Sequence, residues 1–301
     1  MTDRPKHISV CVCTFNRPAL LKRLLDELPR QETSGLFTYS VVVADNEQRQ
    51  SARQVVLEFD AASPIRAVYC FEPVQNIALA RNMALEHATG DYVAFIDDDE
   101  FPATNWLVNL FKTCWVQEAD GVLGPVKAHF EKPPPKWVTK GAFFERPTHE
   151  TGYRVSAKEA RTGNVLFNRR ILEGLQEAAF RPQFGTGGED VDFFTRMMER
   201  GRVFVWCNEA PVFESVPPSR CTRGYLLRRA LLRGRNSLKN PSGRLGNLVK
   251  SLFAVPLYAL SLPVLLIAGQ HVFMKYLIKL LDHAGRLLAL VGLNPIRERD
   301  M

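Results

Sequence analysis

The chain has 301 residues, 46% of them hydrophobic, which is enough for one large domain with an appendage. Its charge of +7 is unevenly placed: residues 223–301 hold 13 Lys and Arg against 3 Asp and Glu, a net of +10, which leaves −3 for residues 1–222. The basic tail is also strongly apolar, so it favours anionic lipid as its partner, and we expect no nucleic acid.

Six cysteines show neither a Cys-x-x-Cys pair nor the spacing of a metal finger. Cys11 and Cys13 alternate in an apolar strand, where a free thiol behaves as a small hydrophobe. Residues 1–7 are polar and lack the apolar core of a signal peptide. We therefore expect reduced cysteines and a cytosolic compartment.

Strands and helices are predicted to alternate along the first half of the chain. Apolar runs predict strands, and apolar residues at helical spacing predict the helices between them. This alternation predicts an α/β fold with a largely parallel, helix-covered sheet. The predicted strands are 8–14, 39–44, 65–70, 92–96, 121–126 and 163–167, and the predicted helices include 18–28 and 75–87.

Four consecutive carboxylates, Asp97-Asp98-Asp99-Glu100, follow the buried strand 92–96 directly. Pro102 is placed to open the next helix. Like charges this close repel one another, and a divalent cation is the usual remedy. An oxygen-only cluster suits Mg²⁺ or Mn²⁺, and ligands of open α/β sheets bind beyond the carboxyl ends of the strands. A solvated acidic turn that caps the next helix is the alternative.

Two common phosphate-binding loops are absent from the sequence. The first strand is not followed by Gly-x-Gly-x-x-Gly, and no Gly-x-x-x-x-Gly-Lys occurs. Any nucleotide must therefore be held by side chains and a metal. Residues 131–162, with a proline run and Trp137, are predicted to form a long loop over the site.

A glycine-rich stretch at 185–190 opens a predicted helix that closes at Gly201. Thr186 and Glu189 have the spacing of a capping box, which would make the stretch structural. Three glycines beside two acids could equally form a pliable loop that carries a carboxylate to a substrate. The pattern leaves both readings open.

Several short motifs, taken in order, resemble those of family 2 glycosyltransferases, especially bacterial exopolysaccharide enzymes of the succinoglycan type. The resemblance spans about residues 8–235. It rests on Val12-Cys13-Thr14-Phe15-Asn16-Arg17, Val43-Ala44-Asp45-Asn46, Ala80-Arg81-Asn82, Asp97-Asp98-Asp99, Leu123-Gly124-Pro125-Val126 and Gly188-Glu189-Asp190.

The resemblance implies a GT-A fold and an inverting transfer from a nucleotide sugar, a UDP-hexose in the first instance. It implies that the donor is bound by Phe15, Arg17, Asp45, Arg81, Asp97 and Asp98, with Asp45 accepting from the uracil ring. Asp99, with Asp97, would bind the Mn²⁺ or Mg²⁺.

The catalytic base implied by the resemblance is Asp190. A hydroxyl nucleophile must lose its proton as it attacks the anomeric carbon, which a positioned carboxylate can accept. The residues that we expect on the acceptor side are Trp137, Asn164 and Glu189. Related sequences often carry His shortly after the last catalytic strand, where this chain reads Val212-Phe213-Glu214. Phe213 cannot bind a metal or phosphate and Glu214 is only a possible substitute, so the metal shell departs from the family pattern.

The tail, residues 223–301, is predicted to be a membrane-attachment region that follows a catalytic domain of residues 1–222. Residues 252–268 are mostly apolar and reach the lower length limit of a bilayer span, but Pro256 and Pro263 interrupt them. Lys275, Lys279, Asp282 and Arg286 then form one polar stripe on an otherwise apolar helix. A packed helical hairpin or a dimer contact would give the same pattern.

Basic residues flank both sides of the apolar stretch, which disfavours a span. We therefore expect residues 251–291 to attach to the cytosolic membrane surface without crossing it. A lipid-linked glycan acceptor would account for that location. Two alternatives stay open: a sugar-nucleotide pyrophosphorylase, and a non-catalytic membrane adaptor with the same fold.

Overall fold

The computed structural model describes residues 5–185, 187–238 and 244–293. The chain divides into two compact units: unit 1 holds residues 1–127 and 146–215, and unit 2 holds residues 128–145 and 216–301. The chain therefore passes between the units three times. The division into a catalytic region 1–222 and an attachment region 223–301 concerns function and stays a prediction.

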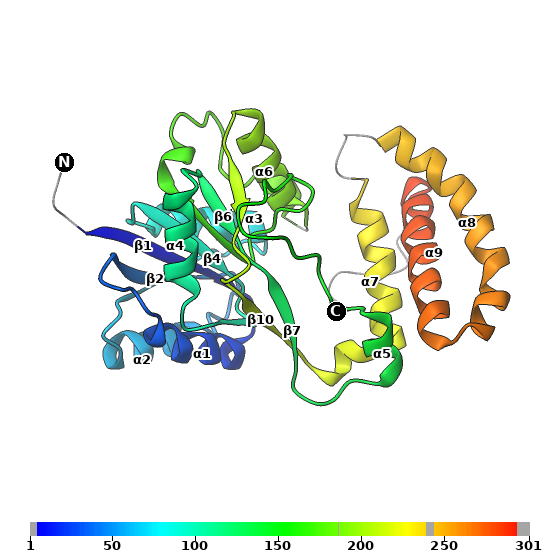
Figure 1. Cartoon of the computed structure of the whole chain (residues 1–301), viewed down its shortest axis with the longest axis horizontal. Helices are drawn as coiled ribbons and strands as arrows, with labels where there is room; N and C mark the ends of the chain where they lie inside the picture. The colour runs from blue at the N-terminus through cyan, green and yellow to red at the C-terminus, as the bar shows by residue number, and fades with distance from the viewer. Residues whose placement is uncertain (1–4, 186, 239–243, 294–301) are drawn as a thin grey trace. The chain divides into compact units, whose positions relative to one another are not determined.

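Unit 1 is built on a seven-stranded sheet in the order β3-β2-β1-β4-β8-β6-β9. Figure 1 labels β1, β2, β4 and β6 of this sheet. Most neighbouring pairs are parallel, and only β8 runs against its two neighbours. The predicted largely parallel sheet is confirmed. Its strands are β1 (Lys6–Thr14), β2 (Phe37–Asp45), β3 (Ala67–Phe71), β4 (Tyr92–Ile96), β6 (Gly121–Leu123), β8 (Asn164–Asn168) and β9 (Phe204–Trp206).

Helices cover both faces of this sheet, because residues alternate sides along each strand and both sides are apolar. One face packs against α1 (Pro18–Glu27), α2 (Arg53–Ala62) and α4 (Trp106–Val116). The other packs against α3 (Ile77–His87) and α6 (Glu189–Glu199). Short 3₁₀ turns complete the unit: η1 (Leu28–Arg30), η2 (Arg169–Leu172) and η3 (Pro182–Phe184).

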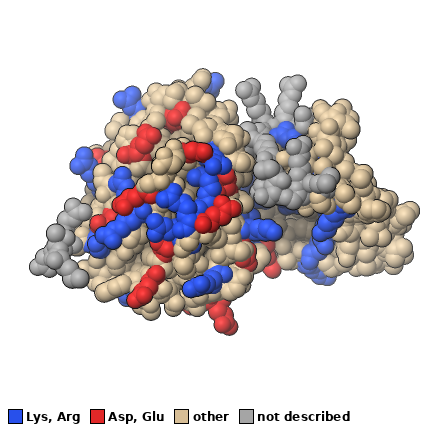
Figure 2. Space-filling model, turned by 90° about the horizontal axis from the view of Figure 1, so that it is seen from above, with Lys and Arg blue, Asp and Glu red and all other residues tan. Residues whose placement is uncertain are grey.

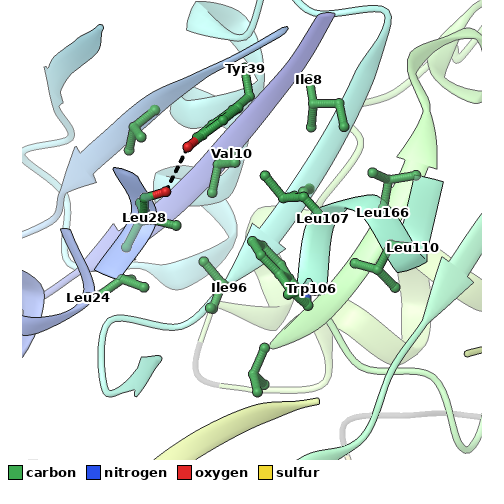
Figure 3. Close-up of a cluster of buried hydrophobic side chains, with 14 of the residues drawn as sticks. Ile8, Val10, Leu24, Leu28, Tyr39, Ile96, Trp106, Leu107, Leu110 and Leu166 are labelled. Atoms are coloured by element: carbon green, nitrogen blue, oxygen red, sulfur yellow. Dashed lines mark hydrogen bonds between the residues drawn. The ribbon is translucent and has the colours of Figure 1, made fainter. Parts of the chain in front are cut away.

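The buried cluster under α1 and α4 contains two polar groups that are satisfied within it. The Tyr39 hydroxyl donates to the Leu28 carbonyl at 2.7 Å (Figure 3). The indole nitrogen of Trp106 donates to the Asn164 side chain at 2.8 Å. Buried polar atoms that keep such partners avoid the cost of desolvation, so the aromatic residues can fill the core.

Two predicted boundaries differ from the structure. Pro102 ends a short strand, β5 (Glu100–Pro102), and α4 begins only at Trp106. The predicted strand 121–126 is divided into β6 and β7 (Val126–Phe130), because Pro125 has no N–H to donate to a ladder. The predicted loop 131–162 contains one short helix, α5 (Lys136–Gly141).

A second, three-stranded sheet has the order β5-β10-β7. Strand β10 (Val212–Val216) runs antiparallel to β5, and its Glu214 is paired in register with Glu100. Glu214, the possible substitute for the His of related sequences, therefore lies beside the acidic cluster after β4.

Unit 2 is helical, with α9 (Gln270–Leu290) packed against α5, α7 (Arg223–Asn236) and α8 (Arg244–Ile267). A fourth short turn is η4 (Pro218–Cys221). Helices α7 and α9 approach each other at two glycines: an added Cβ on Gly234 would lie 2.1 Å from the Asp282 carbonyl oxygen, and one on Gly285 would lie 2.4 Å from that of Leu231. Only glycine permits this crossing.

The predicted polar stripe of α9 is partly used inside unit 2. Asp282 forms an ion pair with Arg233 of α7. Arg286 donates to the hydroxyls of Ser237 and Ser251, each at 2.8 Å. The packed-hairpin alternative therefore accounts for half of the stripe, and Lys275 and Lys279 stay exposed.

Candidate functional site

Three of the predicted site segments lie at one edge of the large sheet. Phe15, Asp45 and Asp97 end or follow β1, β2 and β4, which are adjacent and parallel. Their carboxyl ends therefore meet, and this is the edge at which open α/β sheets bind ligands.

Asp98 and Asp99 are held by residues that follow β1. The Thr14 hydroxyl donates to Asp98 at 2.7 Å, and Arg17 contacts Asp98 at 3.1 Å and Asp99 at 3.4 Å. Both carboxylates are buried. Arg17 is thus brought to the acidic cluster, as a donor-binding residue would be. In this structure its guanidinium forms ion pairs with both Asp98 and Asp99.

Burial makes the negative charge of this cluster costly. It raises the pKa of Asp98 to about 6, although Arg17 and Thr14 oppose the shift. It raises the pKa of the fully enclosed Glu100 well above its usual range, with Asp97 adding to the effect. A raised pKa means that the site favours protonation or a bound cation over bare carboxylates.

Asp97 and Glu100 converge on Gly163. The backbone N–H of Asp97 donates to Glu100 at 3.1 Å. A Cβ added to Gly163 would lie 3.0 Å from one carboxylate oxygen of each residue. The space is therefore tight for any larger residue, because a side chain here would press on both acids.

Arg81 of α3 connects the acidic cluster to the start of α6. Its guanidinium forms a buried ion pair with Glu189, and a second nitrogen lies 3.8 Å from Asp97. Burial raises the pKa of Glu189, and the charge of Arg81 opposes the shift. One Glu189 oxygen, Oε2, is buried with no hydrogen-bond partner among the described residues.

The loop before α6 is tied to α3 at two further points. Asn82 exchanges two hydrogen bonds with the backbone of Phe180, at 2.7 and 2.9 Å. Asn76, the N-cap of α3, donates to the Pro182 carbonyl at 2.9 Å. Gly188 has φ +96°, a conformation that favours glycine, and Thr186 of the proposed capping box lies outside the described residues.

Asp190 lies in the first turn of α6, directly after Glu189. Its carboxylate accepts from the Val191 N–H at 2.7 Å and lies 3.8 Å from Arg161. The side chain is 17% exposed. It is therefore held by the helix N-terminus and still reaches the surface, which a general base must do.

Asp45 is buried and already binds its own loop. Its carboxylate accepts from the N–H groups of Ala52 and Glu47 at 3.0 and 3.1 Å and from the Tyr69 hydroxyl at 3.2 Å. These contacts give it a role in shaping the loop, and its contact with uracil stays a prediction. Phe15 is 43% exposed, as a ring that stacks on a base would need to be.

Two residues that were predicted on the acceptor side have structural contacts. The Asn164 amide binds Trp106 and also donates to the carbonyls of Pro125 and Ala210, at 3.1 and 2.8 Å. Trp137 packs edge-to-face against Phe143 within unit 2. Their roles toward an acceptor stay predictions.

The donor chemistry of the acidic cluster fits a hard divalent cation, because Asp97 and Asp99 offer only carboxylate oxygens. The geometry is not that of a formed cage: within the described ranges, no three His, Cys, Asp or Glu side chains are grouped closely enough to hold an ion. Asp99 is instead paired with Arg17.

Thr14, Glu100 and Gly163 belong to the site but were not among the predicted site residues. Glu100 was visible as the fourth acid of the run. Thr14 lies in the motif 12–17, but its hydrogen-bond partner Asp98 is 84 residues away in sequence. Gly163 carries no side-chain chemistry, so only the strand pairing of β4 with β8 shows its importance.

Fold and site together define a class: an enzyme of the GT-A type, with carboxylates at the carboxyl edge of a helix-covered, mostly parallel sheet. Residues 9–175 match the model of glycosyl transferase family 2. The chain belongs to this family and is a glycosyltransferase.

Relatives and solved structures agree with this membership. The succinoglycan biosynthesis protein ExoM of Rhizobium meliloti is 35% identical over 240 residues, which are 78% of this chain and 75% of ExoM. The hyaluronan synthase of Pasteurella multocida is 24% identical over 72% of this chain, which spans only 26% of that protein.

Two solved structures share the fold at low sequence identity. TarS 1-349 of S. aureus, in complex with UDP, has a TM-score of 0.55 and 15% identity and covers 96% of this chain and 93% of its own. The mannosyltransferase PcManGT of Pyrobaculum calidifontis, in complex with GDP-Man and Mn²⁺, has a TM-score of 0.56 and 19% identity and covers 98% of this chain and 77% of its own.

One helix among the described residues, Gly246–Ile267 within α8, is long and apolar enough to cross a membrane. Only 6% of its most apolar window is buried within the structure. A core helix of a soluble protein would be mostly buried, so this exposure fits a membrane-associating segment.

Proposed function

We propose that this chain is a metal-dependent, inverting glycosyltransferase that transfers the hexose of a UDP-hexose donor to a glycan acceptor. The observation that carries the proposal is the chain of contacts from Asp97 through Arg81 to Glu189, the residue before Asp190. It connects the donor-side acid Asp97 with the first turn of α6, the turn that carries Asp190, through one buried guanidinium.

The residues then divide the chemistry between them. Phe15 and Arg17 would hold the nucleotide, and Asp97 and Asp99 would hold Mn²⁺ or Mg²⁺. The bound ion would offset the charge that develops on the departing diphosphate. Arg17 and Arg81 would add to that electrostatic stabilisation.

Asp190 would accept the proton of the attacking hydroxyl. A single displacement requires the nucleophile and the leaving group on opposite faces of the sugar, which inverts the anomeric configuration. Asp190 lies in the first turn of α6, whereas Asp97 and Asp99 follow β4. The base and the donor-side carboxylates therefore come from separate elements. The expected product has the anomeric configuration opposite to that of the donor, and proton NMR of the product measures it.

A thermal-shift screen of nucleotide sugars, with and without Mn²⁺, tests the donor assignment. A ligand at 100 times its Kd raises the free energy of unfolding by about 2.7 kcal/mol, so the correct donor should stand out. If no nucleotide shifts the transition with Mn²⁺ present, the donor site is wrong. A chain that binds UDP-sugar but never transfers or hydrolyses it would be the non-catalytic adaptor.

The acceptor is proposed to be a lipid-linked glycan at the cytosolic face of a membrane. The support is the exposed apolar helix α8 together with the similarity to an exopolysaccharide biosynthesis protein. Transfer to a lipid-linked glycan in vesicles should exceed transfer to the same glycan in solution. Equal rates would remove the reason for membrane attachment.

A further inference from the structure

Helix α8 has an apolar surface that no other described part of the chain covers. Exposed residues recur at spacings of 4, 3, 4 and 3 and so lie on one side of the helix. We call them the α8 outer stripe: Phe253, Leu257, Leu260, Val264 and Ile267, with Leu260 80% and Ile267 88% exposed.

The opposite side of α8 packs against α9. Ser251 is fully buried and receives a hydrogen bond from Arg286, and Tyr258 meets the rings of Tyr276 and His283. The start of α8 therefore lies beside the end of α9, so the two helices form an antiparallel hairpin.

We infer that the outer stripe lies in the lipid–water interface of an anionic membrane, with α8 parallel to the surface and α9 on its cytosolic side. This inference rests on the proposed membrane attachment and names the surface and orientation that produce it. Spacings of 4 and 3 also occur in coiled coils, so a second copy of the chain must be weighed against lipid.

The residues around the stripe favour lipid. From Ser251 to Met274 the chain has no Asp, Glu, Lys or Arg, and Leu252 and Leu266, which helical spacing places together on one flank of the stripe, are also exposed. A coiled-coil seam is narrow and is bordered by charged positions, whereas an interfacial helix needs a broad apolar side. In Figure 2 the part of the molecule that carries these helices is mostly tan, which means that few charged side chains lie on the visible face.

The charges near the ends of α8 complement an anionic surface. Lys250 precedes the apolar stretch, and Lys275 and Lys279 follow it on α9; all three are exposed. In an antiparallel hairpin these ends are far apart, yet each carries a cation. A helix lying flat places both ends at headgroup level, where Lys attracts anionic lipid.

The hairpin also argues against a span. If α8 crossed the bilayer, α9 beside it would bring Lys275, Lys279, Asp282 and Arg286 to hydrocarbon depth. Asp282 and Arg286 have charged or polar partners in the bundle, whereas among the described residues neither exposed lysine pairs with a carboxylate, and Lys279 has only a cation–π contact with the Tyr276 ring at 5.0 Å. A flat α8 leaves all four outside the hydrocarbon.

Flotation of the full chain with preformed vesicles tests the surface. The test variant is F253S/L257S/L260S, and the matched control is L57S/W115S/V116S, which removes three exposed apolar residues of unit 1. On vesicles of phosphatidylcholine and phosphatidylglycerol, we expect the test variant to bind at least about tenfold more weakly and the control to bind like the unsubstituted chain.

The outcomes separate the two proposals. If the unsubstituted chain does not float, membrane attachment itself fails, and the inference fails with it. If it floats and the test variant floats equally well, only the stripe is wrong. If the test variant instead turns a dimer into a monomer in sedimentation equilibrium and vesicle binding is unchanged, the stripe binds a second copy.

Orientation is measured separately with a fluorescent probe attached to the variants F253C, L260C and I267C, one at a time, and quenched by lipids that carry nitroxides at different depths. The unsubstituted chain gives the background from the native cysteines. A flat helix predicts the same shallow depth at all three positions. A deep central position between shallow ends, or a steady gradient, would overturn the flat orientation.

Discussion

Arg81 and Glu189 form a buried ion pair between residues that are 108 positions apart in the chain. The pair fixes the first turn of α6 to α3 and keeps Arg81 within 3.8 Å of Asp97. Catalytic geometry and folding stability therefore depend on the same contact.

Removing one partner of this pair should destabilise unit 1 strongly. A buried charge left alone typically costs about 3–5 kcal/mol, so we expect Arg81→Met and Glu189→Leu each to lower the free energy of unfolding by about that much. The double substitution should cost less than the sum. Urea denaturation of the four proteins measures the coupling, and additive effects would show that the pair is not an energetic unit.

Asp190→Asn should abolish transfer and leave donor binding nearly intact. Loss of a general base costs about 10²–10⁴-fold in rate with little effect on ground-state affinity. Turnover and UDP affinity are measured on the same preparation. Asp192→Asn is the matched control, because Asp192 lies in the same turn but pairs with Arg181 and Arg196. Near-normal turnover of Asp190→Asn would make Asp190 a helix-capping residue.

Asp99→Asn should weaken donor binding only when metal is present. The amide is a poorer ligand for Mn²⁺, so a higher metal concentration should be needed for activity. Isothermal titration of UDP with Mn²⁺, and again with a chelator, measures the effect. If the substitution lowers UDP affinity equally in both conditions, Asp99 acts through Arg17 and not through a metal.

Gly163→Ala should shift the side chains of Asp97 and Glu100 without removing either carboxylate. The added Cβ would press on Asp97 and Glu100, and overpacking of this kind costs about 1–3 kcal/mol. Gly224→Ala is the control, because a Cβ on this glycine of α7 meets no heavy atom within 4 Å. We expect reduced UDP affinity and a lower unfolding temperature for the first substitution and neither for the second.

The parts of the site that depend on neighbouring residues in sequence were predictable. Asp97, Asp98 and Asp99 follow an apolar strand, and that local pattern locates the edge of the sheet. The contacts made by Arg81 were not predictable, because the resemblance implied only a donor-binding role and its buried partner lies on another element. Asn164 shows the same limit: only the packing of Trp106, Pro125 and Ala210 around it reveals that its amide is used within the fold.

The tail was predictable as apolar helices, but the role of α9 was not. Its charged stripe has the same spacing whether it faces water or a helix, and Gly285, the residue that allows α7 to approach, has no polarity to detect. Removing residues 251–301 to obtain a catalytic fragment would also take α9 away from α5 and α7. Such a fragment would expose their apolar sides and so aggregate.

The three crossings between the units set an order for folding during synthesis. Residues 128–145 leave the ribosome before the second half of unit 1, yet α5 within them packs against α9, which emerges near the end of the chain. Contacts over such separations form late because a long loop must close first. Unit 1 can be complete once residue 215 has emerged, whereas unit 2 cannot. The glycosyltransferase core should therefore acquire its native structure before the helices of unit 2 assemble.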